Sequence, residues 1–410
     1  MRTILRRVGV AGIAVALGLA ALGTAPAALA KDNTIVIWSD SNRADTVRAL
    51  FPNGYKGLAV EVVVKDFGAI RDELGTVTAD AAPDVIVGAH DWVGELAANG
   101  LITSINISTK TKNAIAPYAL EGFNYRGKYY GMPTQIENVA LITNSRLVKK
   151  QPKTFDELQD IALTLQKEGK VTVPFAVPQG ANGDAYHMYP LFSGLGGYVF
   201  KQRANGSLDV RDVGLDNPTF RANDDIINEW NASGLINSKV DYGIAKDAFV
   251  AGKAPFWITG PWEIADTISK LPFKYRISTV PPIVEGIKPV PFLGAQGFMV
   301  TKYAATHGVG SAANSLVGEF MATPSAQSQL AATNFRTPAN TAAAARVTSP
   351  QLKAFGAASV GGVPMPNVPQ MASVWSNLGG AWVNSTKGKG ATPAQRAFAQ
   401  AERNVVKAIG

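Results

Sequence analysis

"PDVIVGAHDWVGELAANG", Pro83 to Gly100, joins the two patterns that decide the fold class. Residues 85–87 are consecutive β-branched apolar side chains, which suit a short strand covered on both faces. Asp91 stands where a helix N-cap is expected, and Gly100 stands where that helix would end. A buried strand followed at once by a helix is typical of α/β proteins.

Further strand and helix patterns lie on both sides of this stretch. "TIVIWSD" (34–40) and "LAVEVVVKD" (58–66) are predicted strands, and "TFDELQDIALTLQKEG" (154–169) has capping-box spacing at its start. Helix is also predicted for residues 241–253, 311–332 and 392–409. This alternation predicts an α/β protein with mostly parallel sheets flanked by helices. Because 410 residues contain no long flexible linker, we expect two such lobes with a ligand cleft between them.

The N-terminal residues have the features of a cleavable secretory signal. Three arginines precede a mostly apolar stretch over residues 8–22, and small residues end in Ala28-Leu29-Ala30. We therefore predict a signal peptide over residues 1–30. The chain has no cysteine for a lipid anchor or a disulfide, so free diffusion in the periplasm is expected.

Charge and motifs argue against several classes of protein. The formal charge of +8 includes three signal arginines, so the mature chain carries 8 − 3 = +5, with scattered basic residues. Nucleic-acid binding normally uses a concentrated basic face and is not expected. The three histidines lack metal-ligand spacing, and no nucleotide-binding loop or nucleophile elbow is present. We expect no cofactor and no metal.

"KAPFWITGPWEI", residues 253–264, places a tryptophan at a strand-to-helix junction. Residues 256–258 suit a buried strand, and Pro261 fits the first position of a helix. Trp262 could belong to the core. Alternatively it could face a ligand, because α/β folds bind ligands beyond the carboxyl ends of their strands.

Six segments resemble the maltose and maltodextrin binding proteins of ABC importers, in family order. They are "IVIWSD" (35–40), "PDVIVGAHDWVGELAANGLI" (83–102), "YRGKYYGMPTQIENVALITNSRLV" (125–148), "YPLFSGLGGYVF" with "DVRDVGLDN" (189–217), "DYGIAKDAFVAGKAPFWITGPWEI" (241–264) and "MPNVPQMASVWSNLGGAWVNS" (365–385). The resemblance implies a type II periplasmic binding protein with one lobe over residues 31–135 plus 298–350. The other lobe would comprise residues 136–293 plus 351–410. It further implies a protein that closes on a sugar by a hinge and docks on membrane permease subunits. We expect a monomer.

The same resemblance implies a set of ligand contacts. Two tryptophans would stack on sugar rings, since an indole can cover the apolar face of a pyranose. The remaining contacts would be polar or would form an apolar wall. The full set is Asn42, Arg43, Asp91, Trp92, Glu137, Asp184, Tyr186, His187, Trp262, Met365 and Trp375. Asn42 and Arg43 could instead be exposed loop residues, and Asp91 and Asp184 could be helix caps.

Departures from the family pattern bear on the substrate. Gly88 stands where many relatives carry tryptophan, and Trp92 replaces a basic residue. Ser376 and Gly379 replace an expected aromatic and basic residue, and His187 replaces an aromatic. Fewer rings predict a short α-glucoside such as maltose or maltotriose, with trehalose as an alternative. An exported glycoside hydrolase is the competing enzyme class, because Asp91, Glu137 and Asp184 could supply a carboxylate pair.

Overall fold

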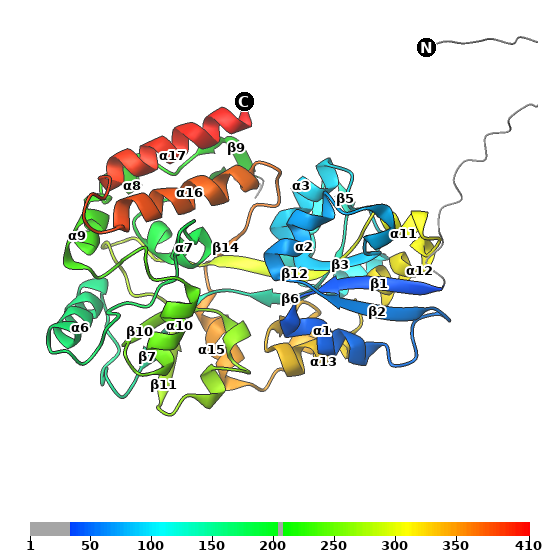
Figure 1. The fold of residues 1–410 in the computed structure, drawn as a ribbon, viewed down its shortest axis with the longest axis horizontal. Coiled ribbons are helices and arrows are strands. Elements are labelled where there is room, and N and C mark those ends of the chain that lie inside the picture. Colours follow the sequence, from blue (N-terminus) through cyan, green and yellow to red (C-terminus); the bar gives the residue numbers. More distant parts are fainter. Residues whose placement is uncertain (1–32, 204–207) are drawn as a thin grey trace, which may run out of the picture.

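The computed structural model describes residues 33–203 and 208–410, so the predicted signal peptide lies outside the described ranges. These residues spread along one long axis, and two strands run through its middle (Figure 1). Within them, no helix is both long and apolar enough to cross a membrane.

The first half of the molecule is built on a seven-stranded sheet with the order β13-β6-β12-β3-β1-β2, and β14 pairs with β12. Its strands are β1 (Thr34–Ser39), β2 (Ala59–Val64), β3 (Val85–Ala89), β6 (Met132–Glu137), β12 (Phe292–Val300), β13 (Thr337–Pro338) and β14 (Val363–Pro364). The associated helices are α1 (Ser41–Leu50), α2 (Phe67–Leu74), α3 (Val93–Ala98), α4 (Thr109–Ala114), α5 (Pro117–Gly122), α11 (Tyr303–Thr306), α12 (Gly310–Ser315), α13 (Pro324–Asn334) and α14 (Thr341–Ala344). One hydrophobic core draws on residues 35–132 and 295–339.

The second half contains a three-stranded sheet, β10-β7-β11, with β7 (Ala140–Asn144), β10 (Phe256–Thr259) and β11 (Tyr275–Ser278). Its helices are α6 (Phe155–Lys167), α7 (Ala185–Gly194), α8 (Pro218–Arg221), α9 (Asp225–Ser233), α10 (Tyr242–Val250), α15 (Pro350–Ala358), α16 (Met371–Thr386) and α17 (Ala394–Ile409). A small hairpin in the first half pairs β4 (Asn124–Tyr125) with β5 (Lys128–Tyr129), and another in the second half pairs β8 (Phe200–Gln202) with β9 (Leu208–Val213). Two further core clusters contain residues between 139 and 292 and between 352 and 405.

The prediction of mostly parallel sheets was wrong for both halves. In the first sheet β1 runs parallel to β2 and β3, but β12 runs antiparallel to β3 and β6. The chain leaves this half along β6 and returns along β12, and a returning strand beside the departing one must run in the opposite direction. In the second sheet β7 is antiparallel to both neighbours. Apolar runs covered on both faces look alike in either orientation, so the sequence pattern did not reveal the direction.

Most predicted elements have a local cause that the structure makes visible. Thr154 caps α6 by accepting from the Glu157 N–H at 3.2 Å, and the Glu157 carboxylate accepts from the Lys153 N–H at 2.7 Å. Asp241 caps α10 in the same way. The predicted helix over residues 311–332 is instead three pieces, with a π-helix at Leu316–Phe320 between α12 and α13. Pro324 begins α13 because a first-turn proline has no helical N–H bond to lose.

Candidate ligand-binding site

A cavity of about 860 Å³ lies where the two halves meet. Its walls come from the starts of α1 and α2 and the end of β3 on one side, and from the start of α7 and the loop after β10 on the other. Glu137, Gln296 and Met365 contribute from the segments that cross between the halves. All eleven residues of the predicted set line this cavity.

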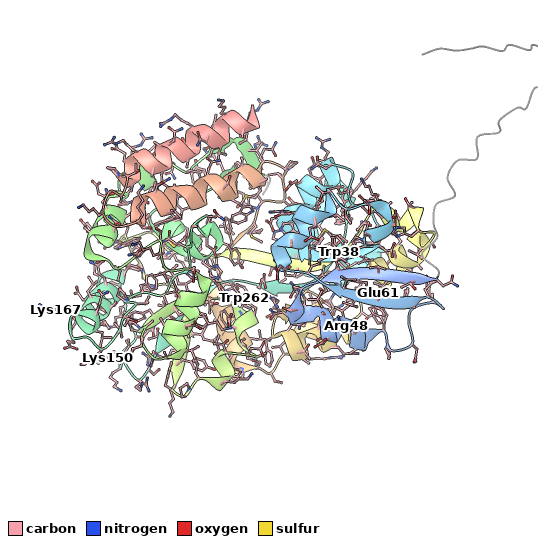
Figure 2. All side chains as sticks on the ribbon, viewed as in Figure 1. Trp38, Arg48, Glu61, Lys150, Lys167 and Trp262 are labelled. Carbon is pink, nitrogen blue, oxygen red and sulfur yellow. The ribbon has the colours of Figure 1, made fainter. Side chains whose placement is uncertain are left out.

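Trp262 extends into the cavity from the loop after β10, and Figure 2 labels it near the middle of the long axis. The helix predicted to begin here is a 3₁₀ helix of three residues, Pro261–Glu263. The Trp262 ring packs on Gly260, where an added Cβ would lie 2.0, 2.2 and 2.5 Å from three ring carbons. These near-equal distances place Gly260 against one face of the indole. A ligand therefore cannot stack on the face that Gly260 covers.

A hydrogen-bonded chain fixes the Trp262 indole. Its Nε1–H donates to the Tyr242 hydroxyl at 2.6 Å, and that hydroxyl donates to Glu263. Lys246 Nζ lies 2.9 Å from the other Glu263 oxygen. Burial and the nearby Glu263 carboxylate raise the pKa of Tyr242, so the phenol stays protonated and able to donate. Sequence reasoning missed these three residues, although the segment 241–264 that carries the family pattern contains them all.

Trp375 and Asp91 connect the two halves across the cavity. The Trp375 Nε1–H on α16 donates to Asp91 at 3.0 Å, and its ring meets Phe292 edge to face at 5.6 Å. Asp91 is not a helix cap, because it lies within a 3₁₀ helix, His90–Trp92, that has no side-chain cap. The cap prediction failed because α3 begins two residues later, at Val93. Burial raises the pKa of Asp91 above its ordinary value.

Trp92 is both core and cavity wall. It is 5% exposed and packs on Phe67 with 4.7 Å between ring centroids. A Cβ at Gly88 would lie 2.5 Å from two Trp92 ring carbons. Trp92 thus fills the space that a larger residue at position 88 would need.

Asn42 and Arg43 lie in the first turn of α1, and the expected loop is absent there. Asp40 caps this helix, with its carboxylate accepting from the Asn42 N–H at 3.0 Å and from Arg43 Nε at 2.7 Å. Arg43 is 2% exposed, and its Nη1 has no hydrogen-bond partner among the described residues. Asn42 is exposed at the cavity edge.

Asp184, Tyr186 and His187 form one cluster at the start of α7. Asp184 is the N-cap, accepting from the His187 N–H at 3.0 Å, and its second oxygen lies 2.7 Å from His187 Nδ1. Burial works against the Asp184 charge, but the adjacent His187 outweighs it and lowers the Asp184 pKa. His187 Nε2 and the Tyr186 hydroxyl are buried and have no partner in the described part of the chain. Both therefore remain available to a polar ligand.

Glu137 sits at the end of β6, where the chain crosses between the halves. One carboxylate oxygen accepts from Gln296 Nε2 at 2.8 Å, and the other accepts from Arg336 Nε. Arg336 is a cavity residue that sequence reasoning missed. Met365 is 6% exposed, and its carbonyl lies 2.9 Å from His90 Nε2.

The charges within the cavity are largely paired with one another. Asp40 pairs with Arg43, Glu137 with Arg336, and Glu263 with Lys246, and Asp184 is hydrogen-bonded to His187. Such pairs leave hydrogen-bonding positions open without a strong net charge, which suits an uncharged polar ligand. The described residues contain no group of three or more His, Asp or Glu side chains placed to hold a metal.

Comparisons with known proteins give a consistent result. A maltotriose-binding protein of Pyrococcus abyssi (strain GE5 / Orsay) is 28% identical over 334 residues, which are 78% of this chain and 70% of the relative. A maltodextrin-binding protein of Bacillus subtilis (strain 168) is 30% identical over 335 residues, 77% of this chain and 75% of the relative. A galactooligosaccharide-binding protein of the same Bacillus strain is 24% identical over 397 residues, 92% of this chain and 91% of the relative.

The family model described as "Bacterial extracellular solute-binding protein" matches residues 49–358. This family binds solutes, so the glycoside hydrolase considered above is excluded. With well over half of its length matched, the chain belongs to the bacterial extracellular solute-binding proteins.

Proposed function

We propose that the protein binds short α-glucosides, maltose to maltotriose, and delivers them to the membrane permease of an ABC importer. The observation that carries this proposal is a cavity lined by Trp262 and Trp375. The acidic side chains that line it, such as Glu137 and Asp184, already have partners within the protein. Indole planes suit the C–H faces of pyranoses, and the open hydrogen-bonding positions suit hydroxyl groups. Two relatives named for maltotriose and maltodextrin point the same way.

The proposed preference for short ligands rests on positions 88 and 379, where the surrounding residues leave no room for a larger side chain. Trp92 occupies the space next to Gly88. Gly379 packs against the loop before α7, where an added Cβ would lie 2.8 Å from the Asn182 carbonyl oxygen. Neither position has room for the additional ring or cation that longer ligands would use. The packing around Gly88 and Gly379 therefore supports a preference for fewer sugar units.

Delivery would work through two lobes that close on the sugar. The proposed lobes are residues 31–135 plus 298–350 and residues 136–293 plus 351–410, a division supported by the separate hydrophobic cores. Because a ligand touches both lobes only when they are closed, binding would favour the closed state. We further propose a monomer, exported to the periplasm by the signal at residues 1–30.

Isothermal titration of the purified chain against maltose, maltotriose, trehalose, maltoheptaose and a galactotriose tests the ligand. We expect the tightest binding with maltose or maltotriose. Tighter binding of maltoheptaose would refute the short-ligand proposal. Tighter binding of galactotriose would replace it with the specificity named for the third relative. Silence across the panel would refute sugar binding.

A further inference from the structure

Arg336 reaches the cavity through long-range strand pairing. It precedes β13, which pairs antiparallel with β6 in the register Thr337 to Ile136 and Pro338 to Gln135. Continuing this register by one residue places Arg336 opposite Glu137, and Arg336 Nε donates to the Glu137 carboxylate. Both side chains are buried, at 6% and 7% exposure. The guanidinium is thus fixed in direction by a partner on the crossing strand.

The same guanidinium also lies close to the Trp262 ring. Its Cζ lies over the indole, 5.7 Å from the ring centroid. Gly260 blocks one face of the ring, as described above. A pyranose stacked on Trp262 would therefore lie near Arg336, which lines the same cavity. The contact also crosses the cavity, because Arg336 follows α13 in the first half whereas Trp262 follows β10 in the second.

Arg336 retains donors for a ligand. Its Nη1 has only a long contact, 3.5 Å to the Asn334 carbonyl, and its Nη2 has no hydrogen bond in the described ranges. Close by, the Glu137 carboxylate accepts from Gln296 Nε2, while Gln296 Oε1 is buried and has no partner among the residues that the structure describes. The Arg336, Glu137 and Gln296 side chains thus present donors and acceptors side by side. Two neighbouring sugar hydroxyls, each able to donate and accept, match this arrangement.

We propose that Arg336 is a further sugar-contacting residue. Its guanidinium would donate hydrogen bonds to hydroxyl groups of the sugar unit stacked on Trp262, while Glu137 fixes the position of the guanidinium. This inference rests on the proposed function. It adds a specificity element on the side of the cavity opposite Trp262. A lysine could not fully replace the arginine, because it lacks the planar fork that reaches Glu137 and the ligand together.

The test is isothermal titration of Arg336→Gln and Arg336→Lys with maltotriose, beside the wild-type chain. The matched control is Arg48→Gln, because Arg48, which Figure 2 labels, pairs with Asp45 at 2.6 Å and is not one of the residues that line the cavity. We expect Arg336→Gln to weaken binding about tenfold to a hundredfold, the range of a lost charge-assisted hydrogen bond. The affinity of Arg336→Lys for maltotriose should lie between those of the wild type and Arg336→Gln. The affinity of the control should match that of the wild type.

Two further measurements separate ligand contact from a structural role. The double variant Glu137→Gln with Arg336→Gln removes both charges, so it avoids leaving a buried carboxylate unpaired. In addition, we would titrate maltotriose analogues that each lack one hydroxyl group. For at least one analogue, the wild type should bind more weakly than it binds maltotriose, whereas Arg336→Gln should bind that analogue and maltotriose equally well. Unchanged or tighter maltotriose binding by folded Arg336→Gln, or no such analogue, would overturn the inference. If the wild type binds no sugar, the proposed function itself fails.

Discussion

Gly260→Ala should displace the stacking indole without straining the backbone. The Gly260 φ of −115° is open to alanine, so the effect comes from the added methyl group alone. That methyl would lie 2.0–2.5 Å from three Trp262 carbons, whereas the optimal distance between non-bonded carbon atoms is about 3.5 Å or more. The ring must therefore move by roughly 1.5 Å, which also stretches its 2.6 Å hydrogen bond to Tyr242.

The expected cost divides between stability and affinity. Overpacking should lower the free energy of unfolding by about 1–3 kcal/mol. Loss of good stacking should weaken maltotriose binding by about 1–2 kcal/mol, or roughly five- to thirtyfold. Thermal unfolding and isothermal titration measure the two effects separately.

The matched control is Gly356→Ala in α15, where an added Cβ meets nothing within 4 Å. That change should leave binding intact and raise stability by up to about 1 kcal/mol, because alanine favours helix. The Gly260 effect on binding should also vanish when Trp262 is already alanine. If Gly260→Ala binds and unfolds like the wild type, the reasoning about the indole's position is wrong.

Three further changes test two residues of the site and one buried acid outside it. Trp262→Ala should weaken sugar binding by about 1–3 kcal/mol with only a modest change in melting temperature, whereas severe unfolding with affinity retained would make the ring a core residue. Tyr242→Phe removes the link between the Trp262 N–H and Glu263, so calorimetry should show affinity lower by about 1 kcal/mol, and equal affinity would contradict that positioning role. Asp224→Asn should stabilise the fold, because burial and the neighbouring Asp225 and Asp216 raise the pKa of Asp224 from 3.8 to about 6. A raised acid pKa makes wild-type stability fall as pH rises from about 4 through 6, so the variant's gain should be absent below pH 4 and reach about 1 kcal/mol above pH 6 in unfolding curves. A pH-independent difference would contradict this account.

Local signals predicted much of the fold. The capping pattern at Thr154 and the apolar runs of β1, β2 and β3 placed these elements where the structure has them. Strand direction was not predictable in this way, because it depends on where the chain crosses between the halves. The break in the predicted helix over residues 311–332 does have a signal in Pro324, which marks a new helix start, whereas the π-helix at Leu316–Phe320 has no such local pattern.

The cavity shows the same division between local and long-range information. The family pattern named eleven residues that line it, including Glu137 and Trp262. Arg336 has no comparable signal, because its position beside Glu137 results from pairing between β13 and β6, which lie 199 residues apart at the contact. For Asp91 a local signal was misleading. Its identity and spacing predicted a helix cap, but its carboxylate instead accepts a hydrogen bond from Trp375.

The position of β12 has a consequence for how the chain acquires its structure during synthesis. This strand lies between β6 and β3 in the first sheet, yet it is made more than 150 residues after β6 begins. Until it emerges, β3 and β6 each have an edge without its final neighbour, and the core formed by residues 35–132 lacks its later contributors. A nascent chain truncated before residue 292 should therefore remain sensitive to protease, and resistance should appear only once residues 292–300 are complete.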